Sequence, residues 1–187
     1  MRVIAGSVKG KQLKTPEGMH TRPTTDRVKE ALFSIIQFEV PGAKVLDLFG
    51  GTGQLGIEAL SRGAKSAVFV DTREDACRLI RENLKRTGFQ DSAQIVRADY
   101  LDYLKRCREK FDIVLLDPPY AEVFLENALK FITEIDILQS GGIIVTERPV
   151  GKELPWDYDG YTRSRDYKYG TTLLTLYHRQ QVEQDSL

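Results

Sequence analysis

The tetrapeptide Asp117-Pro118-Pro119-Tyr120 directly follows a run of four branched apolar residues at positions 113–116. Such a run ending at two prolines predicts a buried strand that enters a rigid loop. Proline has a fixed φ and no N–H, so the carbonyl groups of this loop are held in place. Asp117 adds a second hydrogen-bond acceptor, and Tyr120 adds a flat aromatic face. Two acceptors beside a stacking ring suit a planar group with an exocyclic amino group, such as a nucleobase. Taken alone, the same four residues more often form a simple turn.

A glycine-rich turn lies between the first predicted strand and the helix after it. Gly51, Gly53 and Gly56 have the spacing of a dinucleotide fingerprint, and Asp71 lies 20 residues beyond Gly51. That spacing alone would indicate NAD. Asp47 argues against it, because a carboxylate facing the loop repels a pyrophosphate. S-adenosylmethionine fits better, since it carries no phosphate and its ammonium and sulfonium groups are positive.

Four aspartates are expected at or just inside the C-terminal ends of the first four strands: Asp47, Asp71, Asp99 and Asp117. Ligands of open α/β sheets bind in the crevice at those ends. We expect Asp71 to accept hydrogen bonds from the ribose hydroxyls and Asp99 to accept one from the adenine amino group. The other residues expected in the cofactor site are Thr72 and Tyr100 beside the adenine ring, and Phe49, Gly50, Gly51 and Gly53 in the turn.

The elements that must position these residues alternate between strand and helix from position 44 onward. Apolar runs predict strands at 45–49, 66–70, 93–97, 111–116 and 142–146. Helical periodicity predicts helices at 54–62, at 73–87 with Thr72 as the cap, at 100–108 and at 123–135. This alternation predicts a parallel sheet covered by helices on both faces. Segments 161–167 and 171–178 are typical of a hairpin around Gly170, so we expect one strand to run antiparallel to the rest.

Residues 1–22 are expected to form a small basic β-hairpin appended to the main domain. Strand-like pieces at 2–5 and 12–14 flank a Gly-Lys turn, and a helix is expected to begin near Thr24. The α/β domain itself is expected to cover residues 23–179, and residues 180–187 read as a polar tail.

Composition restricts the class of protein. A chain of 187 residues with 41% hydrophobic and 29% charged residues is expected to be one soluble globular domain. No apolar run approaches the roughly 18 residues that span a membrane, and residues 1–6 lack the apolar region of a secretory signal. Cys77 and Cys107 stand alone, without metal-type spacing, and are expected to be reduced. These features together predict a cytoplasmic protein.

The balance of 27 basic and 27 acidic residues conceals an asymmetry. Residues 1–29 contain seven basic and two acidic residues, a net charge of +5, so the remainder carries −5. A basic arm on an acidic body indicates a polyanion bound at one end, although a solvated, lysine-rich hairpin explains the charge equally well. The candidate phosphate contacts are Arg2, Lys9, Lys11, Lys14 and Arg22.

Two of these motifs together resemble the class I amino methyltransferases: DLFGGTGQLGIEALSRGA at 47–64 and DPPY at 117–120. The opening RVIAG at 2–6 and the block RPTTDRVKEALF at 22–33 are similar to the bacterial RsmD family. The resemblance covers nearly the whole chain. One departure is Asp71, which stands where the family pattern has Glu.

The resemblance implies a Rossmann-like α/β fold with a seven-stranded, mostly parallel sheet and S-adenosylmethionine as the cofactor. It implies methylation of N2 of a guanine in 16S ribosomal RNA, with the RNA free, within the small subunit or in an assembly intermediate. The residues implied to be catalytic are Asp117, Pro118, Pro119 and Tyr120. Hydrogen bonds from N2 to Asp117 and to the Pro118 carbonyl would aim the nitrogen lone pair at the methyl carbon, while Tyr120 stacks on the flipped base. Neither a metal nor a membrane is implied.

Other functions remain open on the sequence alone. The acceptor could be adenine N6, cytosine N4 or a protein glutamine, because each presents an amino group to such a pocket. The chain could instead be an NAD-binding protein or a catalytically inactive relative that binds RNA.

Overall fold

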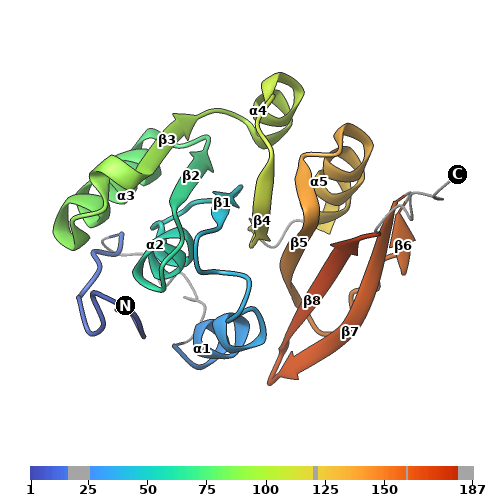
Figure 1. Ribbon diagram of the computed structural model, residues 1–187, viewed down its shortest axis with the longest axis horizontal. Coiled ribbons are helices and arrows are strands. Elements are labelled where there is room, and N and C mark those ends of the chain that lie inside the picture. Colours follow the sequence, from blue (N-terminus) through green and yellow to red (C-terminus); the bar gives the residue numbers. More distant parts are fainter. Residues whose placement is uncertain (17–25, 120–121, 159, 181–187) are drawn as a thin grey trace, which may run out of the picture.

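The computed structural model describes residues 1–16, 26–119, 122–158 and 160–180, which form one mixed sheet with helices on both sides (Figure 1). The helices are α1 (Asp26–Ile35), α2 (Gln54–Ser61), α3 (Glu74–Thr87), the 3-10 turn η1 (Gln90–Ser92), α4 (Tyr100–Arg106) and α5 (Glu122–Ile135). The strands are β1 (Lys44–Asp47), β2 (Ser66–Asp71), β3 (Ala93–Arg97), β4 (Phe111–Leu116), β5 (Leu138–Pro149), β6 (Asp157–Tyr158), β7 (Tyr161–Tyr169) and β8 (Thr172–Arg179).

The strand order is β3-β2-β1-β4-β5-β8-β7-β6. Strands β1 to β5 are parallel, and β8 pairs antiparallel with β5. The sheet has eight strands where seven were expected, and both β8 and β6 run against the parallel set. The additional strand is β6, which has two residues and pairs with the start of β7. Two residues are too few to show a period-two pattern, so the sequence carried no signal for it.

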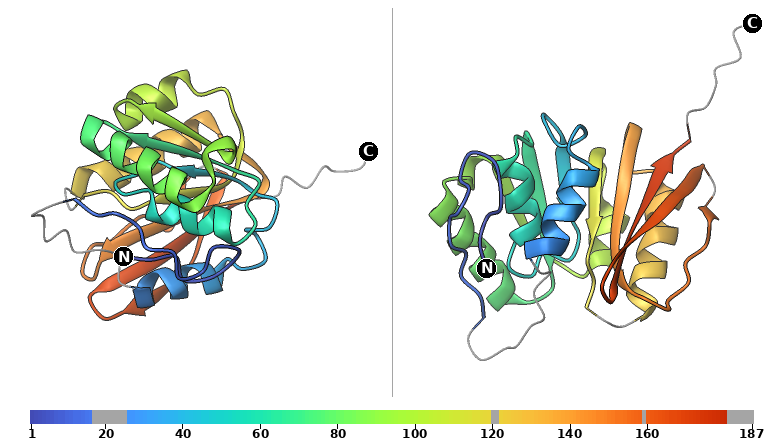
Figure 2. Two further views of the ribbon diagram at one scale, coloured as in Figure 1. Left: turned by 90° about the vertical axis from the view of Figure 1, so that its left-hand side faces the viewer. Right: turned by 90° about the horizontal axis from the view of Figure 1, so that it is seen from below.

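Each face of the sheet packs against its own helices, as the views in Figure 2 show. Alternate residues of the central strands point to opposite faces. Val45, Ile113 and Ile143 join the apolar cluster beneath α1, α2 and α3. Leu46, Val114 and Ile144 join the second cluster, beneath α4 and α5. The central strands contain runs of consecutive apolar residues because helices cover both of their faces.

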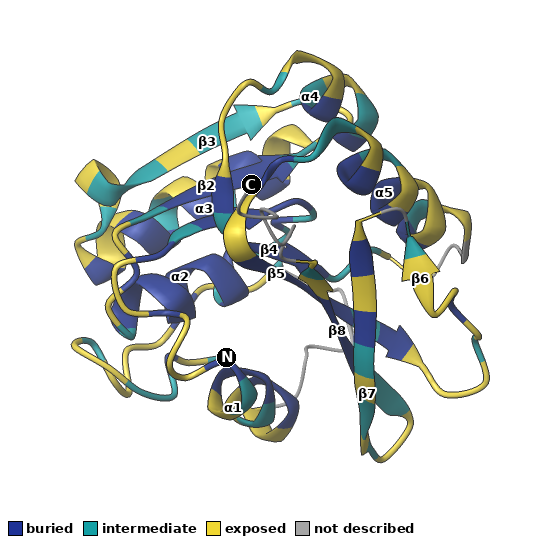
Figure 3. Cartoon of the chain, turned by 45° about the vertical axis from the view of Figure 1, so that its right-hand side comes forward, coloured by how far each residue is buried: buried dark blue, intermediate teal, exposed yellow. Residues whose placement is uncertain are grey.

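Helix α2 is buried along most of its length (Figure 3). All seven residues from 55 to 61 are buried, including Glu58 at 0% exposure. Gly56 makes this possible against β2, because a Cβ there would lie 2.3 Å from the ring of Phe69. The outer side of α2 faces the N-terminal residues 1–8, which hydrogen-bond to it.

Several predicted boundaries shift by a few residues. Helix α3 is capped by Arg73 rather than Thr72 and makes no side-chain cap bond of its own; the carboxylate of Asp71 accepts the Arg73 N–H instead. Gly88 ends α3 at φ 80°, as its position predicted. Helix α4 ends at Arg106, two residues early, and β5 is longer than its predicted core because β8 pairs with it up to Pro149.

The N-terminal arm, residues 1–16, lacks the two regular strands that were expected. A single antiparallel bridge joins Arg2 to Gln12, supported by the bond from the Val3 N–H to the Lys11 carbonyl at 3.0 Å. The expected helix start at Thr24 and the tail at 181–187 lie outside the described residues. Among the helices described, none is long and apolar enough to cross a membrane.

Candidate active site

A cleft of about 1240 Å³ opens at the C-terminal ends of the parallel strands. The cleft lies at the neighbouring strands β1 and β4. From β1 the chain continues to β2 on one side, and from β4 it continues to β5 on the other side. This is the usual ligand position in a doubly wound sheet. Most of the predicted site residues line this cleft: Asp47, Phe49, Gly50, Gly51, Asp71, Thr72, Asp99, Tyr100, Asp117, Pro118 and Pro119. Gly53 does not line it, and Tyr120 lies outside the described residues.

The glycine turn owes its shape to backbone contacts. Gly51 and Gly53 adopt φ values of 54° and 78°, in the left-handed region where a side chain is strained. The Gly50 N–H donates to the Val70 carbonyl at 2.8 Å, and the Gly53 N–H donates to the Gly50 carbonyl at 2.6 Å. Gly53 therefore shapes the turn from behind, at the start of α2, while Gly50 and Gly51 border the cleft.

Asp71 links two parts of the cleft wall. One carboxylate oxygen accepts the Gly51 N–H at 3.0 Å, and the other accepts the Arg73 N–H at 2.9 Å. The Arg73 guanidinium lies 3.5 Å from the same carboxylate. Asp71 thus links the glycine turn to the start of α3 as well as facing the cleft. The spacing of the fingerprint predicted that Asp71 faces the cleft. It did not predict the hydrogen bonds that link the glycine turn to α3.

Asp47 lies at the base of the cleft and is 1% exposed. Burial, together with the nearby charges of Asp117 and Asp71, raises the pKa of its carboxyl group to about 8, against the lowering effect of the bonds from the Gly56 and Phe49 N–H groups. The Gly56 contact is 3.1 Å long. Three carboxyl groups so close together disfavour a pyrophosphate and favour a ligand with positive charge. These three carboxyl groups therefore fit S-adenosylmethionine and do not fit NAD.

The far end of the cofactor side is aromatic. Tyr100 is 6% exposed, packs 5.2 Å from the Phe49 ring centroid and meets Phe124 edge-on at 5.7 Å. Burial raises the pKa of Tyr100, so its hydroxyl stays neutral. Asp99 caps α4 by accepting the Leu101 N–H at 2.9 Å and also borders the cleft. Phe124 was not predicted, because in the sequence it is simply an apolar residue at the start of a helix.

The other side of the cleft is formed by Asp117, Pro118 and Pro119 after β4. Further lining residues, none of them predicted, come from the end of β5, the turn after it, the turn between β7 and β8 and the start of β8: Glu147, Arg148, Pro149, Lys152, Thr171 and Thr172. No motif marked them, because they belong to elements far apart in the sequence.

The N-terminal arm also reaches the cleft, whereas the sequence placed it outside. Met1, Lys14, Thr15 and Pro16 line the wall. The Thr52 hydroxyl contacts the Met1 sulfur at 3.3 Å, and Lys14 forms an ion pair with Glu82 of α3 at 2.6 Å. Lys14 therefore lines the cleft while its side chain stays 52% exposed, and its predicted phosphate contact stays a prediction.

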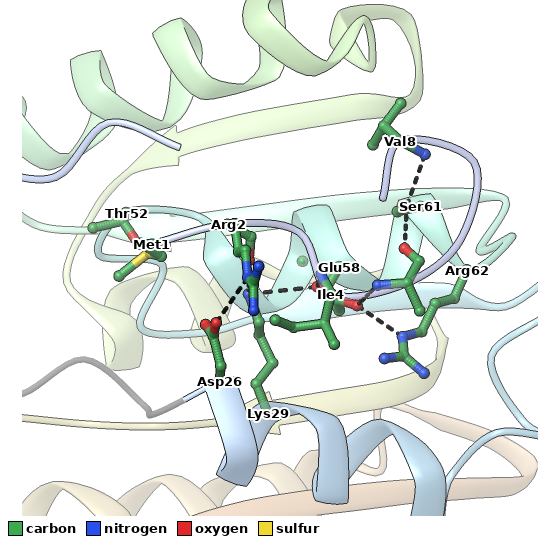
Figure 4. A network of polar contacts seen from close by, with 12 residues as sticks. Met1, Arg2, Ile4, Val8, Asp26, Lys29, Thr52, Glu58, Ser61 and Arg62 are labelled. Carbon is green, nitrogen blue, oxygen red and sulfur yellow. Dashed lines mark hydrogen bonds and ion pairs between the residues drawn. The ribbon is translucent and has the colours of Figure 1, made fainter. Parts of the chain in front are cut away.

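A buried ion pair fastens the arm to the body (Figure 4). The two oxygens of Glu58 accept the N–H groups of Ile4 and Ala5 at 2.8 and 3.0 Å. Lys29 donates to the Arg2 carbonyl at 2.6 Å and lies 3.4 Å from Glu58. Burial lowers the pKa of Lys29 and the Glu58 charge partly offsets it. Lys29 was counted with the basic arm, yet it is 0% exposed and cannot contact a phosphate.

The remaining basic residues of the arm differ in their surroundings. Arg2 pairs with Asp26 at 3.0 Å while its side chain is 57% exposed. Lys9 and Lys11 are exposed, and Arg22 lies outside the described residues. Within the described ranges, no group of three or more His, Cys, Asp or Glu side chains could hold a metal ion.

The family model described as Conserved hypothetical protein 95 matches residues 1–178. The chain belongs to this family. The Bacillus subtilis protein YlbH is 41% identical over 182 residues, covering 96% of this chain and 99% of its own. Ribosomal RNA small subunit methyltransferase D of Escherichia coli is 31% identical over 187 residues, covering 100% and 94%. The solved structure of yhhF from Escherichia coli has a TM-score of 0.87 at 29% identity and covers 97% and 98%.

These relatives confirm the resemblance to the RsmD family and the class I methyltransferase fold. The protein is accordingly an S-adenosylmethionine-dependent methyltransferase that acts on ribosomal RNA. One cleft brings together the glycine turn, Asp71 and Asp117-Pro118-Pro119.

Proposed function

We propose that the protein methylates N2 of a guanine in 16S ribosomal RNA, acting in the cytoplasm. The observation that carries the proposal is the division of one cleft into two sides. Asp47, Gly51 and Asp71 form a side suited to a cationic cofactor, and Asp117 with Pro118 forms a side suited to an amino group. RNA as the substrate class is supported by the relatives named as ribosomal RNA methyltransferases.

S-adenosylmethionine supplies an electrophilic methyl group on a positively charged sulfur. Asp71 is proposed to hold the ribose hydroxyls, and Asp99 the adenine amino group, between Thr72 and the Tyr100–Phe49 pair. Asp47 is proposed to face the cationic part of the cofactor, because it is the most buried of the four strand-end aspartates and the charge of Asp117 acts on it. Gly50 and Gly51 let the backbone approach closely, since neither places a side chain in the way.

On the acceptor side, the amino group of the base is proposed to donate to Asp117 and to the Pro118 carbonyl. The N2 lone pair of guanine is delocalised into the ring and is a poor nucleophile. Two hydrogen bonds would pull N2 towards tetrahedral geometry and aim its lone pair at the methyl carbon. The methylated amine is acidic enough to lose its extra proton to solvent, so Asp117 orients the nitrogen and need not be a strong base. Pro119 fixes the loop, and Tyr120 is proposed to stack on the flipped base.

The RNA backbone is proposed to lie against the arm. Arg2, Lys9 and Lys11 carry exposed positive charge there, and Lys14 brings the arm to the edge of the cleft. Arg22 is kept as a candidate phosphate contact from its sequence position. Phosphate contacts would set the position of the RNA, leaving the choice of base to the cleft.

The test is transfer of a tritiated methyl group onto RNA from a strain that lacks the gene. Free 16S ribosomal RNA, assembly intermediates and complete small subunits are compared as substrates, and the labelled nucleoside is identified after digestion. We expect N2-methylguanosine, with one of the three substrates clearly preferred. A label on adenosine, cytidine or protein would overturn the proposal.

A further inference from the structure

Glu147 and Asp117 follow paired residues of two neighbouring strands. Strands β4 and β5 are parallel neighbours, and their register pairs Leu115 with Val145 and Leu116 with Thr146. The next residues are Glu147, which is still within β5, and Asp117, which is the first residue after β4. Neighbouring strands run about 4.8 Å apart, and both residues line the cleft.

The two carboxylates also belong to the same face of the sheet. Ile113 and Leu115 of β4 share one apolar cluster with Ile143 and Val145 of β5. Side chains alternate along a strand, so positions 117 and 147 continue that face. The fold therefore presents two carboxylates side by side at the point where the acceptor base is proposed to enter.

The backbone at Glu147 is held by strand β8 and by the residues that follow it. Glu147 is paired with Leu174 of β8, and Pro149 follows two residues later. The Arg148 guanidinium is buried, donates to Asp166 at 2.6 Å and to Thr175 at 3.3 Å, and also bonds to the Lys152 carbonyl. Residues locked in this way keep a neighbouring side chain in one position.

We infer that Glu147 is a specificity-determining residue that accepts the N1–H of the target guanine while Asp117 holds its N2 amino group. The inference rests on the proposed function and names the part of the base that the cleft reads. Guanine presents N1–H and N2–H as adjacent donors, and two adjacent carboxylates are complementary acceptors. Hydrogen bonds to a charged partner are the strong ones, which makes this contact selective.

The same pair of carboxylates rejects the other amino-bearing bases. Adenine and cytosine each carry an acceptor nitrogen beside the amino group, at N1 and N3. That lone pair would face the Glu147 carboxylate, leaving two acceptors opposed without a proton between them. A site built around a polar contact discriminates strongly against a ligand that cannot make it. A preference for guanine over adenine and cytosine then follows from the Glu147 side chain.

The test changes the hydrogen-bonding group of this contact on both the RNA and the protein. In the 16S ribosomal RNA fragment that carries the methylated guanine, this guanine is replaced by 2-aminopurine, which keeps the 2-amino group but has an unprotonated N1. Wild type is expected to prefer guanine by at least about tenfold in kcat/KM, the effect of one lost charge-assisted bond. Glu147→Gln can donate its amide to N1 of 2-aminopurine, so the preference should fall at least about tenfold.

Binding gives a second readout that does not depend on turnover. The fluorescence of 2-aminopurine reports its unstacking, and Glu147→Gln should bind this RNA more tightly than wild type does in the presence of S-adenosylhomocysteine. Glu153→Gln is the matched control: it makes the same chemical change at an exposed position that does not line the cleft, and it should behave as wild type. Equal cofactor affinity and melting temperature confirm that the Glu147 variant is folded.

The outcomes separate the two proposals. If wild type methylates guanine and Glu147→Gln keeps the same preference for guanine over 2-aminopurine, the role of Glu147 is overturned and the proposed function stands. If wild type methylates another base, both are overturned. A variant that loses activity on the two RNAs equally would make Glu147 a structural residue and would also overturn its role in specificity.

Discussion

The aspartates at the strand ends shape the protein as well as facing the ligand. Asp71 accepts two backbone N–H groups, and Asp99 accepts one at the start of α4. Sequence spacing predicted that both would face the crevice, because parallel strands end at a common edge. It could not predict the backbone bonds, since these depend on how the turns after each strand are folded. Loss of either carboxylate would therefore affect both local order and affinity.

Asp117→Ala should lower the methylation rate by at least about 100-fold while S-adenosylmethionine affinity stays within a few-fold of wild type. The reason is that the proposed bond to the amino group is strongest in the transition state. Single-turnover rates and calorimetric affinities measure the two effects separately. Asp112→Ala, at the opposite end of β4, controls for loss of a carboxylate from the same strand. A rate near wild type in Asp117→Ala would reduce the tetrapeptide to a structural turn.

The pKa of Asp47 predicts that cofactor binding is coupled to proton release. In the folded protein the carboxyl group has a pKa of about 8 because of burial and the nearby Asp117 and Asp71 charges, so it is mostly protonated at pH 7. A cationic ligand favours the carboxylate, and binding at pH 7 should release up to one proton. Affinity should then rise between pH 6 and pH 8, by up to about tenfold per pH unit.

Calorimetry in two buffers of different ionisation enthalpy counts these protons, and Asp47→Asn should release none. The sign for stability is the reverse. Because the folded pKa is raised above the unfolded value of about 3.9, the folded state binds the extra proton, and the free energy of unfolding of the ligand-free protein should fall as pH rises from about 4 to about 8. Proton release that is identical in wild type and Asp47→Asn would exclude Asp47 as its source.

At the scale of elements, the sequence predicted what is buried on two faces and missed what is not. The central parallel strands were located because each contains an apolar run, whereas the edge strand β3 has only Ile95 and Val96 as large apolar residues. The arm pairs with itself less regularly than expected. Three backbone hydrogen bonds and one bridge join its two halves, while Ile4 and Ala5 donate instead to Glu58 of α2. The available signal was a glutamate in the middle of an apolar helix. A buried charge requires a partner, and here the partners are Lys29 and the backbone of the arm.

The arm is expected to bind RNA through phosphates. The variant Lys9→Gln/Lys11→Gln should lower affinity for any RNA and flatten the slope of log affinity against log salt by roughly 0.7 to 0.9 per lost contact. Lys14 is left unchanged because it lines the cleft and pairs with Glu82. The methylated base should stay the same, since phosphate contacts position the RNA and do not select the base.

The matched control for the arm is Lys105→Gln/Arg106→Gln. This control also removes two positive charges, but from the last turn of α4. That helix begins at the cleft edge of the sheet and ends towards the opposite edge. Its salt slope should equal that of wild type. If the arm variant and the control give the same slope as wild type, the arm is a solvated hairpin and the RNA binds elsewhere.

The whole molecule divides the work of one cleft between the two halves of its sheet. Strands β1, β2 and β3 end at the glycine turn, Asp71 and Asp99, while β4, β5 and the β7–β8 turn supply the side proposed for the methyl acceptor. Alternation of strands and helices predicted the crevice. The acceptor wall could not be predicted, because it assembles residues 117, 147 and 171 from three elements whose adjacency only the fold establishes. A net charge of zero over the chain likewise conceals an acidic cleft beside a basic arm.

Ligand-induced stabilisation tests this division for the intact protein. A ligand present at 100 times its Kd stabilises a two-state protein by about 2.7 kcal/mol, and each kcal/mol raises the melting temperature of a domain of this size by about 2–4 °C. S-adenosylmethionine should therefore raise it by about 5–11 °C. NAD at the same concentration should leave it unchanged, because its pyrophosphate would meet the carboxyl groups of Asp47, Asp71 and Asp117. In the variant Asp47→Asn, which cannot carry a negative charge at this position, S-adenosylmethionine should raise the melting temperature less, since the cationic ligand loses its buried partner. An equal shift with NAD would instead mean that the glycine turn binds a dinucleotide and that the acidic cleft does not select its ligand by charge.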